Sequence, residues 1–133
     1  IRYLQQLITS SRQRLLDPSR HLYVEVGTDG YAPPVIPVYR EIGLDAMCPF
    51  EVAAGCDVVA VAREYPDLAI FGGIDKRILA QSKDAIDREL ERIIPVMRER
   101  GGYITTCDHG VPEEVPYENY LHYRQRCVEL GEG

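Results

Sequence analysis

Short apolar runs alternate with longer segments of helical spacing along this chain. Four of these runs are strand candidates. The second is shorter than the first, and the first and third stop at glycine, as strands often do. The four runs span residues 21–26, 44–47, 68–71 and 103–106. The pattern therefore predicts four strands, each followed by a polar loop.

Helices are predicted around these strands. Apolar residues recur at helical spacing over 35–42, 58–63, 82–100 and 116–130, and the first residues of the chain also have the pattern of an amphipathic helix. The segment 82–100 is the clearest, because Ser82 can cap it and one apolar stripe runs along it. That stripe consists of Ile86, Leu90, Ile93, Ile94 and Met97.

The alternation of helices and strands predicts an α/β protein with a parallel sheet. Four strand–helix units in 133 residues are about half of a (β/α)8 barrel, whose usual length is about 250 residues. A small doubly wound sheet has the same order of elements, and periodicity does not separate the two. No internal repeat or linker divides the chain, so we expect one domain over residues 1–133, and a partial one if it is a half-barrel.

Composition and charge exclude some functions. The chain is 45% hydrophobic, 27% charged and has a net charge of −6, which argues against a nucleic-acid-binding surface. No run approaches the roughly 20 apolar residues of a membrane span, and the N-terminal residues do not resemble a signal peptide. Four cysteines in an α/β pattern suit free thiols in a reducing compartment. We therefore expect a cytoplasmic protein that binds neither nucleic acid nor membrane.

Chemically capable side chains follow every predicted strand. Functional sites of parallel α/β folds lie at the C-terminal ends of the strands. Many such residues only cap the next helix, so a single Asp is weak evidence. All four loops together make a site at this edge the better interpretation. The loops contribute Asp29, Glu51, Asp75, Lys76, Arg77, Cys107, Asp108 and His109.

Among these residues, His109 is the strongest single candidate. A histidine between Asp108 and Gly110 in such a loop can act as an acid, a base or an anion donor. The alternative is an ordinary solvated loop histidine. The pair Gly72-Gly73 lets the backbone approach a ligand closely, or simply forms a tight turn. His21 and His122 fall outside the strand-end loops, and we expect neither to be functional.

A metal site is not predicted. Zinc would require a set such as Cys48, Cys107, His109, Asp29 and Glu51 to converge on one face. The chain has neither CxxC nor HExxH spacing, however. Cys56 and Cys127 fall within helical patterns, where thiols are usually packed and inert.

Several motifs together resemble those of the uroporphyrinogen decarboxylase superfamily. Residues 72–75 follow an apolar strand as the G-N-L-D segment of that family does, and residues 108–112 with 116–119 resemble its closing segment. That segment consists of a His-Gly pair, a short loop with proline, and Pro-x-Glu-[His/Asn] at the start of the last helix. Residues 28–30 and 45–57 resemble earlier motifs of its decarboxylase-like branch. The resemblance extends from about residue 21 onward.

The resemblance implies a fold and an activity. The fold is the C-terminal half of a (β/α)8 TIM barrel of parallel strands, about four βα units. The activity is cofactor-independent decarboxylation of a carboxylated, tetrapyrrole-like small molecule. The family's pyrrole-binding Asp and carboxylate-binding arginines belong to an N-terminal half that these residues do not include. We predict that His109 and Asp29 are catalytic. The predicted substrate-binding residues are Gly72, Gly73, Asp75, Arg77, Glu51 and Asp108.

Two other functions stay open. The superfamily also contains zinc-dependent corrinoid methyltransferases, but Gly27, Asp29 and Asp108 stand where their zinc ligands would be. The chain could instead be a catalytically silent module for binding or assembly. A half-barrel leaves two sheet edges and one apolar face uncovered, so we expect it to form a homodimer or to pair with a missing N-terminal half-barrel.

Overall fold

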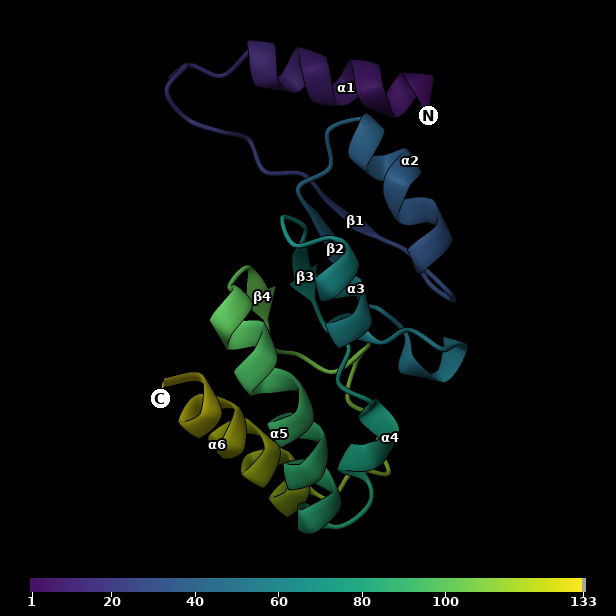
Figure 1. Cartoon of the computed structure of the whole chain (residues 1–133), viewed down its shortest axis with the longest axis vertical. Coiled ribbons are helices and arrows are strands. Elements are labelled where there is room, and N and C mark those ends of the chain that lie inside the picture. Colours follow the sequence, from purple (N-terminus) through teal and green to yellow (C-terminus); the bar gives the residue numbers. More distant parts are fainter. Residues whose placement is uncertain (133) are drawn as a thin grey trace.

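The core of the molecule is a sheet of four parallel strands in the order β1-β2-β3-β4. It is described by a computed structural model, which covers residues 1–132, and Figure 1 shows its arrangement. The strands are β1 (Glu25–Gly27), β2 (Ala46–Cys48), β3 (Ala69–Phe71) and β4 (Tyr103–Ile104). Each overlaps a predicted run but is shorter, because only the paired residues form the ladder, and β1 and β2 extend one residue beyond their runs.

Helices separate these strands as the sequence pattern predicts. The six α-helices are α1 (Arg2–Gln13), α2 (Ile36–Glu41), α3 (Val58–Glu64), α4 (Lys76–Leu79), α5 (Lys83–Arg100) and α6 (Tyr117–Glu132). Two 3-10 turns, η1 (Pro33–Val35) and η2 (Val52–Ala54), precede α2 and α3. Neither α4 nor η2 is predicted, since a single turn is too short to show a helical period. No helix of residues 1–132 is long and apolar enough to cross a membrane.

The order of the strands resolves the choice that periodicity left open. Each strand pairs with the next one along the chain, and every pairing is parallel. Because β-α-β crossovers are right-handed in nearly all proteins, crossovers that all step the same way place their helices on the same face. A doubly wound sheet reverses direction once. The fold is therefore α/β and consistent with part of a (β/α)8 barrel, as predicted.

The two faces of the sheet differ in how they are covered. The register aligns Val26, Met47, Ile70 and Tyr103 across the four strands, so these side chains share one face. Met47 and Ile70 are fully buried there and belong to the main apolar core. The opposite face carries Phe71 and Ile104, the latter 51% exposed. In a closed barrel this second face would point inward.

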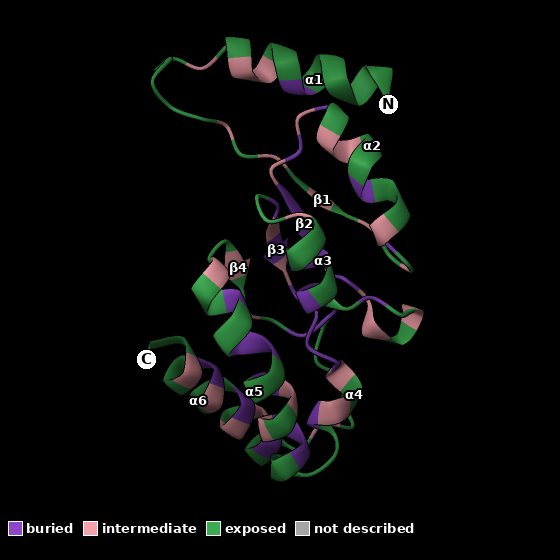
Figure 2. Ribbon diagram, viewed as in Figure 1, coloured by how far each residue is buried: buried purple, intermediate pink, exposed green. Residues whose placement is uncertain are grey.

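The long helix α5 supplies much of the core. Its predicted apolar stripe is buried along its whole length, and Leu90, Ile93 and Met97 have no solvent exposure. Ser82 caps the helix by accepting a hydrogen bond from Ala85 N–H at 3.2 Å. The helix packs mainly against α6 and also contacts α3 and α4, and Figure 2 shows buried segments along its length. This element confirms the prediction from periodicity.

Helix α1 lies at the opposite end of the molecule from α5 and α6 (Figure 1). It is exposed except around Ile8. Arg12 donates to Asp45 at 2.7 Å, and His21 contacts the same carboxylate at 2.8 Å. Asp45 precedes β2, at the N-terminal edge of the sheet. His21 thus helps to connect the N-terminal segment to the edge of the sheet opposite the predicted site.

The glycine pair that follows β3 is packed against the loop after β2. A Cβ atom on Gly72 would lie 2.2 Å from the carbonyl oxygen of Pro49, and one on Gly73 would lie 2.1 Å from Cγ1 of Val58. Both residues are buried with φ of +97° and +80°. Close packing within the chain is enough to explain why both positions are glycine.

We expect Gly73→Ala to destabilise the protein by about 2–4 kcal/mol, because a strained backbone and an overlap with Val58 add together. Gly30→Ala is the matched control. Gly30 has a similar φ of +75°, but nothing lies within 4 Å of its Cβ position, so it should cost about 1–2 kcal/mol. Urea unfolding measures both. Equal losses would show that the contact with Val58 has no energetic weight.

Candidate functional site

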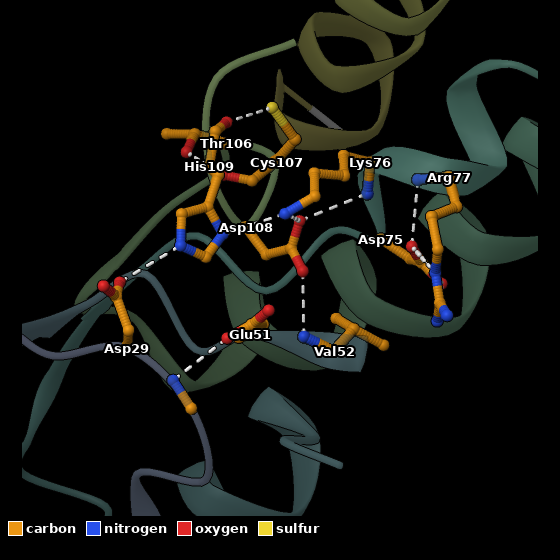
Figure 3. A network of polar contacts seen from close by, with 11 residues as sticks. Asp29, Glu51, Val52, Asp75, Lys76, Arg77, Thr106, Cys107, Asp108 and His109 are labelled. Atoms are coloured by element: carbon orange, nitrogen blue, oxygen red, sulfur yellow. Dashed lines mark hydrogen bonds and ion pairs between the residues drawn. The ribbon is translucent and has the colours of Figure 1, made fainter. Parts of the chain in front are cut away.

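The predicted functional residues gather at the C-terminal edge of the sheet (Figure 3). Asp29 follows β1, Glu51 follows β2, Asp75 and Arg77 follow β3, and the pair 108–109 follows β4. Since all four strands are parallel, their C-terminal ends meet at this edge. Residues up to 80 positions apart in the sequence are thereby brought into contact.

Asp108 is the buried centre of this group. Its side chain is 1% exposed. One carboxylate oxygen accepts a hydrogen bond from Val52 N–H at 2.9 Å, and the other accepts one from Lys76 N–H at 3.3 Å. These N–H groups begin η2 and α4. Asp108 therefore ties the loops after β2, β3 and β4 together, and its oxygens are already engaged.

His109 lies next to Asp108, and each of its two ring nitrogens contacts another side chain of the site. Nε2 lies 3.2 Å from Oδ1 of Asp29, and Nδ1 lies 3.1 Å from Nζ of Lys76. The backbone carbonyl of His109 accepts a hydrogen bond from the thiol of Cys107 at 2.8 Å. The imidazole is 32% exposed, whereas Asp29 is 87% exposed. The ring is thus held in place and remains accessible, as a group that meets a ligand must be.

Lys76 is one of the strand-end loop residues named from the sequence, but it is missing from the predicted catalytic and substrate-binding residues. Its ammonium lies 3.9 Å from Oδ1 of Asp108 in addition to the contact with His109. Its side chain is only 25% exposed. The sequence offers one signal for it, a lysine directly after the capping Asp75 in a strand-end loop. Nothing in the sequence shows that it points toward His109.

Glu51 fixes the first of the four loops. Its Oε2 accepts a hydrogen bond from Gly30 N–H at 3.0 Å. Gly30 directly follows Asp29, and its carbonyl accepts from the thiol of Cys56. Glu51 thus connects the loop after β2 to the loop that carries Asp29.

Asp75 and Arg77 form a local pair at the start of α4. Asp75 caps the helix by accepting from Arg77 N–H at 2.9 Å, and its two oxygens also accept from the guanidinium, at 2.8 Å from Nη2. The side-chain hydrogen bonds from Arg77 hold the pKa of Asp75 below its usual value, although burial opposes them. The guanidinium of Arg77 is therefore already engaged by Asp75. Figure 3 shows this pair beyond Lys76, away from His109.

The cysteines near the site are neutral thiols. Burial raises the pKa of Cys107, and burial together with Glu25 raises that of Cys48 to about 11. A protonated thiol is a poor nucleophile and a poor metal ligand. Within residues 1–132, no three His, Cys, Asp or Glu side chains are grouped so as to hold a metal ion. The Cys48–Cys107–His109–Asp29–Glu51 group considered from the sequence does not form such a cluster.

An open hollow of about 230 Å³ lies next to His109 on the β4 side. It is lined by Thr106, Cys107, His109, Gly110, Val111, Tyr120, Tyr123 and Arg124. The hollow thus lies between the loop after β4 and the first half of α6. The motif residue Asn119 lies elsewhere, where its amide donates to the carbonyls of Leu79 and Gln81 and joins α6 to the end of α4.

Taken together, the structure defines an α/β protein with a polar site at the C-terminal ends of four consecutive parallel strands. The chain belongs to the uroporphyrinogen decarboxylase (URO-D) family, whose model matches residues 3–129. The motifs over residues 28–30, 45–57, 72–75 and 108–119 lie within that match, and each contributes residues to the strand-end loops that build the site.

Individual relatives agree with this assignment. The chain is 33% identical over 119 residues to the uroporphyrinogen decarboxylase of Syntrophotalea carbinolica, which covers 80% of this chain and 33% of that protein. It is 34% identical over 62 residues to the uroporphyrinogen decarboxylase of Geotalea uraniireducens, covering 47% of this chain and 18% of that one. The chain thus spans a third or less of the length of these relatives.

The pairing of Asp75 with Arg77 predicts a dependence of stability on pH. Because the folded-state pKa of Asp75 is lowered, its contribution is complete above the ordinary carboxyl pKa and is lost as the pH falls through the folded-state value. Asp75→Asn keeps a capping side chain but removes the charge. We expect the variant to be modestly less stable than the parent at neutral pH, since Arg77 is solvent-exposed.

Urea unfolding at a series of pH values below neutrality checks this expectation. The stability difference between parent and Asp75→Asn should shrink as Asp75 becomes protonated. Glu113→Gln, at an exposed loop position, serves as the control. A difference that persists unchanged in acid would mean that the charge of Asp75 contributes nothing.

Proposed function

We propose that this chain supplies one part of the active site of a uroporphyrinogen decarboxylase-like enzyme. The substrate is a carboxylated, tetrapyrrole-like small molecule, and the chain is one partial domain of the enzyme. The observation that carries the proposal is the placement of His109, held between Lys76 and Asp29 at the strand ends, in a chain of this family. Such a group is positioned to meet an anionic substrate.

The proposed reaction breaks the bond between a carboxylate and the carbon that bears it. The electron pair stays on that carbon, CO2 leaves, and a proton is then delivered to the carbon. In this scheme His109 and Asp29 contact the reacting group, while Lys76 contributes positive charge. Asp108 and Glu51 hold the loops in fixed positions relative to one another. The scheme uses no cofactor. Free thiols at all four cysteines suit the reducing cytoplasm in which we place the enzyme.

The corrinoid methyltransferase alternative has no observation in its favour among residues 1–132, since their His, Cys, Asp and Glu side chains do not form a metal-binding group. One zinc ion bound per chain, measured by metal analysis, would support the methyltransferase alternative again. The assembly alternative is favoured by the free edges of β1 and β4, which each pair on one side only in the part of the chain described. The two experiments below separate it from the decarboxylase.

The decarboxylase proposal predicts that this chain, closed by a complementary N-terminal half-barrel, converts uroporphyrinogen to coproporphyrinogen. His109→Gln should lower the rate by about 10²–10³-fold, as loss of one positioned hydrogen bond to charge in the transition state does. His122→Gln is the matched control, since His122 lies on α6 and contacts Asp87. The product is measured by chromatography under anaerobic conditions. A closed barrel that forms no coproporphyrinogen contradicts the decarboxylase and leaves the assembly function.

We also propose that the chain pairs through its free sheet edges, either with a second copy or with an N-terminal half-barrel. Unpaired edges and an exposed apolar face favour association. For the chain alone, sedimentation equilibrium should show dimers. Ile104→Lys, on the uncovered face of β4, should shift them toward monomers, whereas Val96→Lys, on α5 and also partly exposed, should not. Monomers at all concentrations would contradict pairing between copies.

A further inference from the structure

The surroundings of His109 fix which of its ring nitrogens carries the proton. Among residues 1–132, the group that contacts Nδ1 is the ammonium of Lys76, at 3.1 Å, and an ammonium has no lone pair with which to accept. Nδ1 must therefore be the acceptor. At Nε2 the partner is the carboxylate of Asp29, at 3.2 Å, which accepts but does not donate when ionised.

A doubly protonated ring does not fit this arrangement. It would direct an N–H group at the ammonium of Lys76, and two donors would face each other across 3.1 Å. The opposite neutral form, with the proton on Nδ1, would repeat that conflict and would also leave Nε2 facing a carboxylate. Only the neutral ring with its proton on Nε2 satisfies both contacts.

Lys76 is itself held where it can impose this choice. The backbone N–H of Lys76 donates to Asp108 at 3.3 Å, and its ammonium lies 3.9 Å from the same carboxylate. Asp108 is almost completely buried and also accepts from Val52 N–H. The lysine therefore cannot move far from the ring without leaving a buried carboxylate less well compensated.

Asp29 differs from Lys76 in being easily displaced. It is 87% exposed, and its hydrogen bond to His109 is long for an interaction with a charged acceptor. A carboxylate of a bound ligand can take its place at Nε2–H, because it offers the same acceptor atoms. The ring then acts as a donor aimed at an anion, with the charge of Lys76 behind it.

We propose that Lys76 is a positioning residue that holds His109 as a neutral Nε2–H donor for a carboxylate group of the ligand. This inference deepens the proposed function and rests on it for the identity of the ligand. It replaces a general acid–base role for His109 by hydrogen-bond donation to an anion. The effect of Lys76 on the ring of His109 can be measured without any enzymatic turnover.

The test is ring ¹⁵N NMR of the histidine-labelled chain in buffer about two pH units above the ordinary histidine pKa of ~6.5. The chain has three histidines, and His109→Gln assigns the signals. We expect His109 to be protonated at Nε2, with an acceptor-type shift at Nδ1. A ring protonated at Nδ1 in the unmutated chain would overturn the proposal, whatever the variants do.

Lys76→Met should lower the ratio of the Nε2–H form to the Nδ1–H form roughly tenfold, the size of one charge-assisted hydrogen bond. Lys76→Arg should restore it, because a guanidinium also donates. Lys83→Met is the matched control, at the chain's other lysine, which is exposed at the start of α5. Circular dichroism confirms that each variant is folded. An unchanged ratio in folded Lys76→Met overturns the proposal.

The outcome is distinguishable from that of the proposed function. If the ring responds to Lys76 but the closed barrel does not act on uroporphyrinogen, the positioning role stands and the decarboxylase fails. If the closed barrel is active but the ring ignores Lys76, the reverse holds. In an active barrel, a positioning role further predicts that Lys76→Arg retains more activity than Lys76→Met.

Discussion

The arrangement of the site depends on the buried carboxylate of Asp108. A buried carboxylate without partners would cost several kcal/mol, so the chain must bring donors to it. It does so with Val52 N–H and Lys76 N–H, which come from the loops after two other strands. Satisfying one charge therefore fixes three loops relative to one another. As a consequence, the side chains on those loops keep fixed positions relative to one another.

Around this constraint the strand-end residues divide into two groups. Asp108, Glu51 and Asp75 accept hydrogen bonds from backbone N–H groups and shape the loops. His109 and Asp29 remain accessible to solvent beside them. The division has a physical reason, since exposed loops are stable in one conformation only when their polar groups are paired locally. Residues that hold the edge together thus leave others free to meet a ligand.

The sheet imposes a second constraint, because only one of its faces is covered. The face that carries Met47 and Ile70 is packed against helices, whereas Ile104 on the other face is half exposed. A parallel sheet is normally covered on both faces. The strands continue in one direction without reversal, as in a barrel, and the chain spans a third or less of the relatives it matches. Together these facts are consistent with part of a barrel, in which the second face would point inward.

The sequence by itself determined the order of the elements, the stripe of α5 and the edge at which the candidate site residues gather. The order of the elements and the stripe follow from periodicity, which is a local property. The edge follows from the general geometry of parallel strands. The sequence did not determine the short turns α4 and η2, which lack a full helical period. Periodicity also left open the choice between barrel and doubly wound sheet, which, within the sequence, only the resemblance of the motifs decided. Only the tertiary structure showed that Gly72 and Gly73 pack against Pro49 and Val58, and that Lys76 faces His109. Those contacts join residues far apart in the chain, and their geometry depends on how strands pair, which no local pattern records.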